Sequence, residues 1–461
     1  MISQKCYDSY RNKTKIFRKR KTGGKGMKRK VLSVMLCAAM VVSMTACGGS
    51  DAKENTASAN ASVSETEQGE ATEQDAQEEE PITCTLTVWS PSEDQDPEYG
   101  QWLNTMCDQF NELHPNWDIT FNYGVCTESD AKKLVPQDID AAADVFIYSS
   151  TGLENLCQAN SLTEFGGKYL DTIRENYSSV LADSLTYDDG VYGVPMTTNT
   201  YFMYYDKSVF SEDDIKSLDT MLEKGKVAIP LNNGFYLASF YLGAGATFFG
   251  EEGNEREAGI VLDNDETLAM TNALIDMVQN ENLVVSSPED AIAMMREGNV
   301  NAYFCGTWQA AQTEEILGDN FGVAPLPSMT VDGEEVQLKP FTSSKAIGVK
   351  STTAYPQVAI ELAMYLGGYD SQKLHYETRG YVPCYKGLVN DTEIQKDAVV
   401  AVDSWTVENI AVPRANYTEM SYFWTAAESF GNELRDGIMT HENAAEKLKT
   451  LEESSNTSGV N

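Results

Sequence analysis

From residue 82 onward, strand-like and helix-like segments alternate along the chain, and this alternation limits the possible folds more than any other feature. Residues 83–89 alternate polar and apolar side chains, which predicts a strand. Apolar residues at helical spacing follow over 102–113, and further strands are predicted at 117–123 and 144–148. Because strands that alternate with helices form mostly parallel sheets covered by helices, we expect an α/β fold.

A second series of the same kind fills the rest of the chain. The strands expected there cover 201–205, 227–230, 301–304, 321–324 and 346–349. The helices expected there cover 266–278, 288–297, 422–438 and 440–451, and Ser287 suits the N-cap of the second helix. Two α/β lobes fit both this series and the length of 461 residues.

The charge is spread unevenly along the chain. The whole sequence has 34 basic and 70 acidic residues and a formal net charge of −36. Residues 1–46 hold twelve basic residues and one acidic residue, so the body that follows is strongly acidic. Binding to phosphates needs a basic face, and we therefore exclude nucleic acid as a partner.

The basic N-terminal segment has the features of an export signal. Lys28, Arg29 and Lys30 precede an apolar stretch at 31–42, and small residues then lead to Cys47. This order is typical of a signal peptide, and the cysteine after Thr-Ala resembles a bacterial lipobox, which predicts lipidation of Cys47. The alternative, a membrane-spanning anchor, is short for a hydrocarbon core of about 30 Å.

A low-complexity acidic segment follows Cys47. Residues 48–81 contain ten acidic residues, one lysine and almost no large apolar side chain. Such a segment cannot bury enough apolar surface to offset its ordering entropy, so we expect a disordered tether. The expected organisation is therefore a basic extension and lipoprotein signal peptide at 1–46, then the lipidated cysteine and acidic linker at 47–81.

Motifs of metal sites and of common enzymes are missing from the sequence. Six cysteines follow Cys47 without a Cys-x-x-Cys pair, which excludes zinc ribbons and thioredoxin-type sites but leaves disulfide pairing open. The three histidines are isolated, so neither a metal nor a cofactor is expected. The nucleophile elbow, the phosphate-binding loop and the His-Glu-x-x-His motif are absent. A carboxylate pair for glycoside hydrolysis stays possible among so many acidic residues.

Aromatic side chains are frequent near strand ends and beside glycines. Aromatic rings pack against the C–H faces of a pyranose, and neighbouring polar side chains can then bind its hydroxyls. Any single ring of this kind is more often a core residue. Trp308, which follows a strand in the turn Gly306-Thr307-Trp308, is instead predicted to contact a ligand.

Several motifs in order resemble one known family. The segments are 190–195 (GVYGVP) with 204–207 (YYDK), then 296–308, then 321–327 (FGVAPLP), and finally 412–413 (VP) with 423–424 (FW). Together they span 82–451 and resemble the solute-binding proteins of ATP-binding-cassette sugar importers, with the maltose/maltodextrin-binding branch as the nearest match.

The resemblance implies a two-lobed, type II periplasmic-binding-protein-like α/β fold with a hinge and an interlobe cleft. Lobe 1 would comprise 82–198 plus 346–392, and lobe 2 would comprise 199–345 plus 393–461. The hinge crossings would lie near 197–201, near 341–345 and in the 390s.

The resemblance also implies a set of ligand-binding residues. Trp308 and Trp424 match the stacking tryptophans of the second lobe, and Asn199 and Asn233 stand where the family carries acidic residues. Thr151-Gly152 replaces an expected Asp-Arg pair, so the contacts to sugar hydroxyls differ from those of the family. The full expected set is Trp308, Trp424, Tyr236, Phe235, Tyr148, Glu93, Asp94, Asn199, Asn233 and Tyr201.

The function implied is capture without catalysis. A monomer, lipid-anchored at the extracellular face of the membrane, would bind an oligosaccharide, maltodextrin above all, and deliver it to an ATP-binding-cassette permease. Two alternatives stay open: an extracellular glycan-active enzyme, and a sensory binding module for a different sugar.

Overall fold

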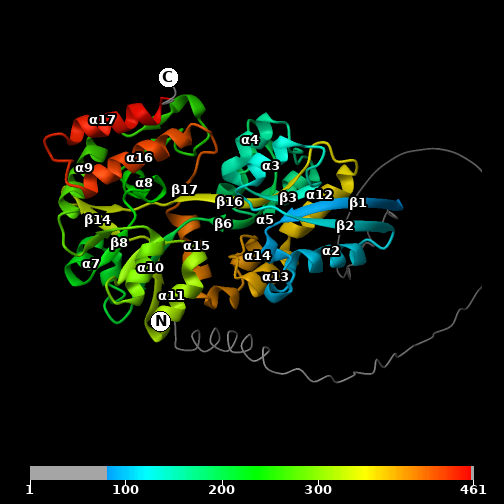
Figure 1. Ribbon diagram of the computed structural model, residues 1–461, viewed down its shortest axis with the longest axis horizontal. Helices are drawn as coiled ribbons and strands as arrows, with labels where there is room; N and C mark the ends of the chain where they lie inside the picture. Colours follow the sequence, from blue (N-terminus) through cyan, green and yellow to red (C-terminus); the bar gives the residue numbers. More distant parts are fainter. Residues whose placement is uncertain (1–79, 458–461) are drawn as a thin grey trace, which may run out of the picture. The chain divides into compact units, whose positions relative to one another are not determined.

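The computed structural model describes residues 80–457, and within them two sheets with flanking helices form two lobes (Figure 1). The expected signal peptide, the lipidation of Cys47 and almost all of the acidic linker lie outside the described residues. Within 80–457 no helix has the length and apolar character needed to span a membrane.

The first sheet has six strands: β2, β1, β3, β16 and β17 (Val412–Pro413) follow one another in this order, and β6 also pairs with β16. The strands β1 (Ile82–Ser90), β2 (Trp117–Val125) and β3 (Val145–Ser149) run parallel. The strand β16 (Phe341–Val349) runs antiparallel to β3 and also to β6 (Val194–Asn199). The alternation predicted for the first strand is observed, because Cys84, Leu86 and Val88 are buried and Thr83 and Thr85 are exposed.

Helices cover this sheet through their apolar faces. The helix α2 (Trp102–Leu113) buries residues at the predicted helical spacing: Trp102, Leu103, Met106, Cys107 and Phe110. The other helices of this lobe are α3 (Ala131–Gln137), α4 (Leu153–Gln158), α5 (Lys168–Asn176), α6 (Ser179–Asp183), α12 (Pro356–Gly367), α13 (Tyr369–Arg379) and α14 (Lys386–Val389).

The second sheet has the strand order β11-β8-β12-β7-β13. The strands β11 (Leu283–Val285), β8 (Val227–Ile229) and β12 (Ala302–Cys305) run parallel. The strand β7 (Phe202–Asp206) lies between β12 and β13 (Phe321–Ala324) and runs antiparallel to both. In each sheet most strands run in one direction, as the sequence pattern predicts, while β16 runs antiparallel to β3 and β6 in the first sheet and β7 runs antiparallel to its neighbours on both sides in the second.

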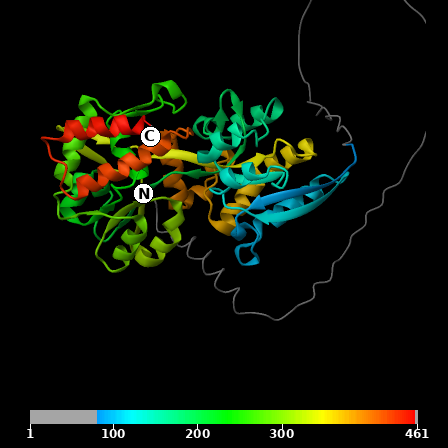
Figure 2. The same cartoon turned by 45° about the horizontal axis from the view of Figure 1, so that its top comes forward.

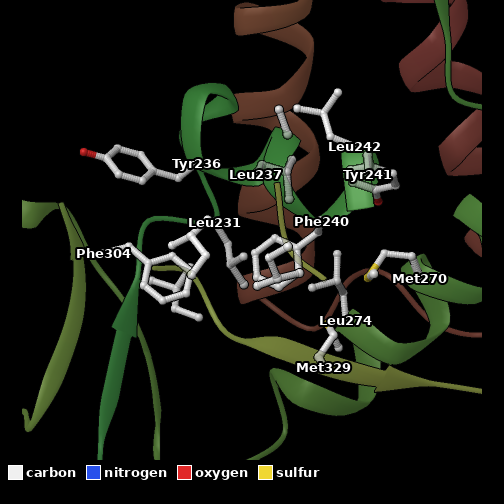
Figure 3. Packing of buried hydrophobic residues seen from close by; sticks show 14 of the residues in the cluster. Leu231, Tyr236, Leu237, Phe240, Tyr241, Leu242, Met270, Leu274, Phe304 and Met329 are labelled. Atoms are coloured by element: carbon white, nitrogen blue, oxygen red, sulfur yellow. The ribbon is translucent and has the colours of Figure 1, made fainter. Parts of the chain in front are cut away.

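Helices pack on both faces of the second sheet. One side carries α7 (Leu218–Lys224), α8 (Gly234–Gly243), α9 (Asp265–Met277), α16 (Met420–Arg435) and α17 (Ala444–Ser455), and Figure 3 shows the packing of α8 on Met270 and Leu274. The other side carries α10 (Pro288–Arg296), α11 (Ala310–Leu317) and α15 (Ala398–Asn409). Ser287 caps α10 as predicted, because its hydroxyl accepts a hydrogen bond from the Asp290 amide at 3.1 Å.

Short two-stranded sheets complete the fold. They pair β4 (Thr186–Tyr187) with β5 (Gly190–Val191), β9 (Thr247–Phe248) with β10 (Ile260–Val261), and β14 (Ser328–Val331) with β15 (Glu334–Gln337). The last helix begins at Ala444, four residues later than its pattern predicts, because residues 440–443 form a turn before it.

Each lobe has its own large hydrophobic core. One core draws on residues from 84–196 and 346–384, and the other on residues from 201–341 and 415–451. The lobe boundaries expected from the sequence stay a prediction. The six cysteines of the described part are all free, and burial raises the pKa of the Cys107 thiol to about 12.

The strand β16 connects the two lobes. Its first residues, Phe341 and Thr342, pair with the short strand β17 (Val412–Pro413) beside the second lobe. Its later residues, from Lys345 to Val349, pair with β3 in the first lobe. Figures 1 and 2 show β16 passing between the lobes. The predicted strand at 346–349 is therefore longer, because it begins five residues earlier at Phe341.

A buried carboxyl group joins α15 to the crossing next to β16. The Thr198 hydroxyl donates a hydrogen bond of 2.7 Å to Asp403 Oδ2, and Asp403 has no exposed surface. Burial raises the pKa of Asp403 to about 7, although the Thr198 hydrogen bond acts in the opposite direction. An unfolded chain releases this proton near pH 4. The contribution of Asp403 to stability therefore falls as the pH rises from about 4 to about 7.

Replacing Asp403 by asparagine tests this assignment. The stability of Asp403→Asn relative to wild type should rise between pH 5 and pH 8, by roughly 2–3 kcal/mol, because the amide cannot ionise. Urea unfolding at both pH values measures the difference. The matched control is Asp263→Asn, at an exposed position, and it should show no such trend. Equal differences for Asp403→Asn at both pH values would contradict the buried, protonated carboxyl group.

Candidate ligand-binding cleft

The carboxyl ends of both sheets meet at the hinge. In the first sheet, the last residue of β3, Ser149, pairs with Lys345, and the last residue of β6, Asn199, pairs with Ser343. In the second sheet, the last residue of β12, Cys305, pairs with Phe202 at the start of β7. Only two residues separate β6 from β7, so the two edges adjoin across the hinge. Ligands of α/β folds bind at such edges.

Trp308 lies at this edge of the second lobe, directly after β12. Its side chain is 51% exposed, an unusual state for so large an apolar group. The ring folds back over Gly306, because a Cβ at that glycine would lie 2.0 Å from the Trp308 ring and 2.6 Å from the Thr200 carbonyl oxygen. The ring therefore stands beside the hinge with part of its surface open.

Two further rings extend this edge. Helix α8 follows β8, and Asn233 caps the helix by accepting a hydrogen bond of 3.0 Å from the Phe235 amide. Trp424 of α16 packs on the first residue of the same helix, since a Cβ at Gly234 would lie 2.8 Å from its ring. Phe235 and Trp424 are both half-buried. We call Trp308, Phe235 and Trp424 the aromatic wall.

Two predicted ligand-binding tyrosines support the wall from below. Tyr201 is fully buried, its hydroxyl donates to the Tyr236 carbonyl oxygen at 3.2 Å, and its ring centre lies 5.0 Å from that of Phe235. Tyr236 is 4% exposed, and Figure 3 shows its ring pointing away from the packing around Phe240. In this conformation, burial leaves both rings as supports of the wall without a face open to a ligand.

The two predicted acidic residues of the first lobe differ in environment. Glu93 is exposed after the end of β1 and accepts a hydrogen bond from Ser92. Asp94 is fully buried, and its Oδ1 lies 3.0 Å from His375 Nε2 and 3.1 Å from Arg379 Nε. Burial alone would raise the pKa of Asp94, but His375 and Arg379 outweigh it and hold the pKa below its usual range. Asp94 therefore anchors α13, and its carboxylate contacts His375 and Arg379 of that helix and not the open cleft.

Tyr148 does not offer a stacking face in this structure. Its side chain has no exposed surface within β3, and its hydroxyl donates to the Tyr192 carbonyl oxygen at 3.2 Å. The resemblance places a stacking aromatic of the first lobe here, but burial by the surrounding core excludes a ligand from this ring in the observed conformation.

A polar cluster near the hinge was missed by sequence reasoning. Lys345 Nζ donates to Glu128 Oε1 at 2.8 Å and lies 3.4 Å from the Tyr381 hydroxyl, which itself donates to Glu128 at 3.2 Å. Although burial favours neutral lysine, Tyr381 and Glu128 raise the pKa of Lys345 overall. Glu128 follows a predicted strand just as Glu93 does, and this position could have identified it as a candidate site residue. We call Glu128, Lys345 and Tyr381 the polar cluster.

The hinge strands form a polar floor between wall and cluster. Asn199 Nδ2 donates a hydrogen bond of 2.9 Å to Ser343 Oγ across the two crossing strands. Because side chains alternate along a strand, Phe341, Ser343 and Lys345 share one face of β16. Phe341 lies against Trp424, with ring centres 6.1 Å apart, and Lys345 belongs to the polar cluster. This face of β16 therefore leads from the aromatic wall to the polar cluster.

An ion pair joins the lobes next to the floor. Glu154, in α4 of the first lobe, is buried and accepts hydrogen bonds from Arg256 Nη1 at 2.7 Å and from the Thr418 amide at 2.5 Å. Arg256 also donates to Glu419 at 2.9 Å and lies over the Tyr417 ring. We call this set the interlobe clasp.

A separate groove lies away from the hinge, between α16 and α17, and has a volume of about 790 Å³. Its lining includes Thr425, Ser429, Glu433 and Lys447, and Lys447 pairs with Glu433 at 2.9 Å. This groove lacks an exposed tryptophan and polar residues from the first lobe, both of which are present at the hinge.

No group of His, Cys, Asp or Glu side chains among the described residues is placed to hold a metal.

Comparison with known proteins agrees with this architecture. A family model described as bacterial extracellular solute-binding protein matches residues 105–402. A solved structure with acarbose is 40% identical, covers 81% of this chain and 98% of its own, and has a TM-score of 0.74. A maltotriose-binding protein of Pyrococcus abyssi is 22% identical over 70% of this chain and 72% of its own length. A galactooligosaccharide-binding protein of Bacillus subtilis is 24% identical over 87% and 91%.

The interlobe clasp yields a prediction for the unliganded protein. Removing the carboxylate in Glu154→Ala deletes the contacts to Arg256 and Thr418, so the lobes should separate further and the radius of gyration should increase in small-angle X-ray scattering. The exposed control Glu428→Ala removes the same charge and should scatter like wild type. A scattering curve for Glu154→Ala that matches wild type would show that the clasp does not hold the lobes.

Proposed function

Because the chain belongs to the bacterial extracellular solute-binding proteins, we propose that it captures an oligosaccharide in the cleft and delivers it, chemically unchanged, to an ATP-binding-cassette permease. The observation that carries the proposal is the half-exposed ring of Trp308 at the carboxyl edge of the second sheet, beside the hinge and the polar floor. An exposed ring next to hydrogen-bonding groups suits a pyranose, which presents apolar C–H faces and a rim of hydroxyls.

The ligand class we favour is a malto-oligosaccharide. The order of motifs in the sequence resembles the maltodextrin-binding branch, and a relative is named for maltotriose. The relative named for galactooligosaccharides makes the second class to test. Both classes are neutral, which fits a wall built from rings and a cleft whose acidic and basic side chains are largely paired with each other.

The mechanism is lobe closure on the bound sugar. The aromatic wall of the second lobe binds the sugar rings first, and the half-buried Asn199, held by the fully buried Ser343, lies at the base of the cleft. Rotation about the hinge then brings Glu93 and the polar cluster to the hydroxyls. A ligand that contacts both lobes shifts the population toward the closed form by its greater affinity for that form. The closed form is the one presented to the permease.

The anchoring follows from the N-terminal segment. We propose that Cys47 is lipidated, that the acidic linker acts as a tether, and that the monomer works at the extracellular face of the membrane. Labelling of cells with a radioactive fatty acid tests this directly, because Cys47→Ser should abolish the label on the protein.

A thermal-shift panel tests the ligand class. Maltose, maltotriose, cyclodextrins and galacto-oligosaccharides should be compared with unrelated glycans, because a ligand that binds only the native state raises its melting temperature. Chromatography of maltotriose after incubation with the protein should show the sugar unchanged. Release of shorter sugars would instead identify an enzyme, and no shift with any sugar would contradict the proposed function.

The aromatic wall yields a quantitative prediction. Trp308→Ala should weaken binding of the best sugar from the panel by about 1–3 kcal/mol, because the sugar loses its stacking partner. The matched control is Trp405→Ala, since Trp405 is 45% exposed but lies on α15, which covers a face of the second sheet. Calorimetry should show control binding equal to wild type. Wild-type affinity in Trp308→Ala would remove this ring from the site.

A further inference from the structure

Arg414 is a cation that neither the sequence motifs nor the relatives assign to the site. It follows β17 directly, and its amide donates to the Thr342 carbonyl oxygen at 2.8 Å. The pairing of Thr342 with Pro413 continues by one residue to Ser343 and Arg414. Neighbours in a parallel register share a face, so Arg414 projects on the same side of the sheet as Ser343 of the polar floor.

The guanidinium of Arg414 has no counter-ion in residues 80–457. No carboxylate of this part lies within 4.0 Å of it, and it makes no hydrogen bond to these residues, while its Nε is buried. Burial lowers the pKa of Arg414 to about 10, and no acidic group acts against that decrease. Two other arginines of the chain do have counter-ions: Arg256 pairs with Glu154 and Glu419, and Arg379 pairs with Asp94.

The position of the guanidinium is nevertheless well defined. Its carbon lies 5.0 Å from the ring centre of Trp424, a residue of the aromatic wall. Asn416 Oδ1, two residues further along the chain, is another buried polar atom without a partner among the described residues. Buried polar groups without partners are rare and costly, and the unpaired guanidinium beside Trp424 therefore has hydrogen-bond donors available to a bound molecule.

We propose that Arg414 is a ligand-binding residue, whose guanidinium donates hydrogen bonds to the oxygen atoms of a neutral sugar unit packed against Trp424. This inference rests on the proposed function and adds a charged donor to the aromatic wall of the second lobe, in addition to Lys345 of the polar cluster. A neutral acceptor is favoured over an acidic sugar, because Glu93 and Glu128 stand on the opposite lobe and the chain carries a net charge of −36.

The energetic consequence separates a binding role from a structural one. A half-buried cation without a counter-ion costs stability in the unliganded protein, because its buried Nε loses water without gaining a partner. Removing it should leave the unliganded fold as stable as before or more stable, and should weaken sugar binding at the same time. A residue that serves the fold would instead lower stability when replaced.

The experiment compares Arg414→Met with wild type in calorimetry with maltotriose and in thermal unfolding without sugar. Methionine keeps an unbranched apolar chain against Trp424 but removes the charge and the donors. We expect the Kd to rise at least about tenfold, as for a lost charge-assisted hydrogen bond, and the melting temperature to stay equal or rise. Arg414→Lys, which keeps the charge without the planar donors, should bind between the two. The control Arg435→Met removes an exposed arginine paired with Asp436 and should bind like wild type.

Several outcomes would overturn the inference. Wild-type affinity in Arg414→Met, or a lower melting temperature with unchanged affinity, would identify a structural residue while leaving the proposed function intact. Tighter binding of a glucuronate-containing oligosaccharide than of maltotriose, abolished in Arg414→Met, would replace the neutral acceptor by a carboxylate. A wild-type protein that binds no sugar would overturn the proposed function itself, and this inference with it.

Discussion

The whole arrangement depends on one strand that belongs to two lobes. β16 pairs with β17 beside the second lobe and with β3 and β6 in the first, so its nine residues pair with three strands that lie in different parts of the molecule. Its alternating side chains place Phe341, Ser343 and Lys345 on one face. Phe341 contacts the aromatic wall, Ser343 accepts a hydrogen bond from the Asn199 amide, and Lys345 belongs to the polar cluster. A single continuous backbone thus sets the spacing between groups on different lobes, because neither end can shift without breaking pairs at the other.

The exposed groups of the cleft are held by buried ones that take no part in binding. Trp308 keeps its place because Gly306 leaves room for the ring. On the other lobe, His375 lies between the rings of Trp102 and Tyr381, at 4.2 Å and 4.4 Å, and is held by Asp94. This stack positions Tyr381, whose hydroxyl reaches Glu128. Preorganised groups lose little conformational entropy when a ligand arrives, which is the general route to affinity without a large interface.

Sequence patterns predicted the two-lobed α/β fold, most of its strands and the exposed Trp308, because these depend on local periodicity and turn chemistry. They could not show which side chains are buried where burial depends on pairing between distant segments. Tyr148 lies within β3, which is buried between β1 and β16, whereas Trp308 lies three residues beyond the end of the equally buried strand β12. Glu93 and Asp94 are adjacent, and only the approach of His375, 281 residues away, decides which is buried. The role of Lys345 likewise depends on the return of β16 to β3.

The same shared strand also determines the order in which the protein can fold. The first sheet contains residues 82–199, yet β3 and β6 have no neighbour between them until β16 at 341–349 is present. A ribosome must therefore synthesise the chain to residue 349 of 461 before the first lobe can close its sheet, and contacts of such long range form slowly. Late closure of this sheet leaves the first lobe open for longer than a lobe whose strands follow one another directly along the chain.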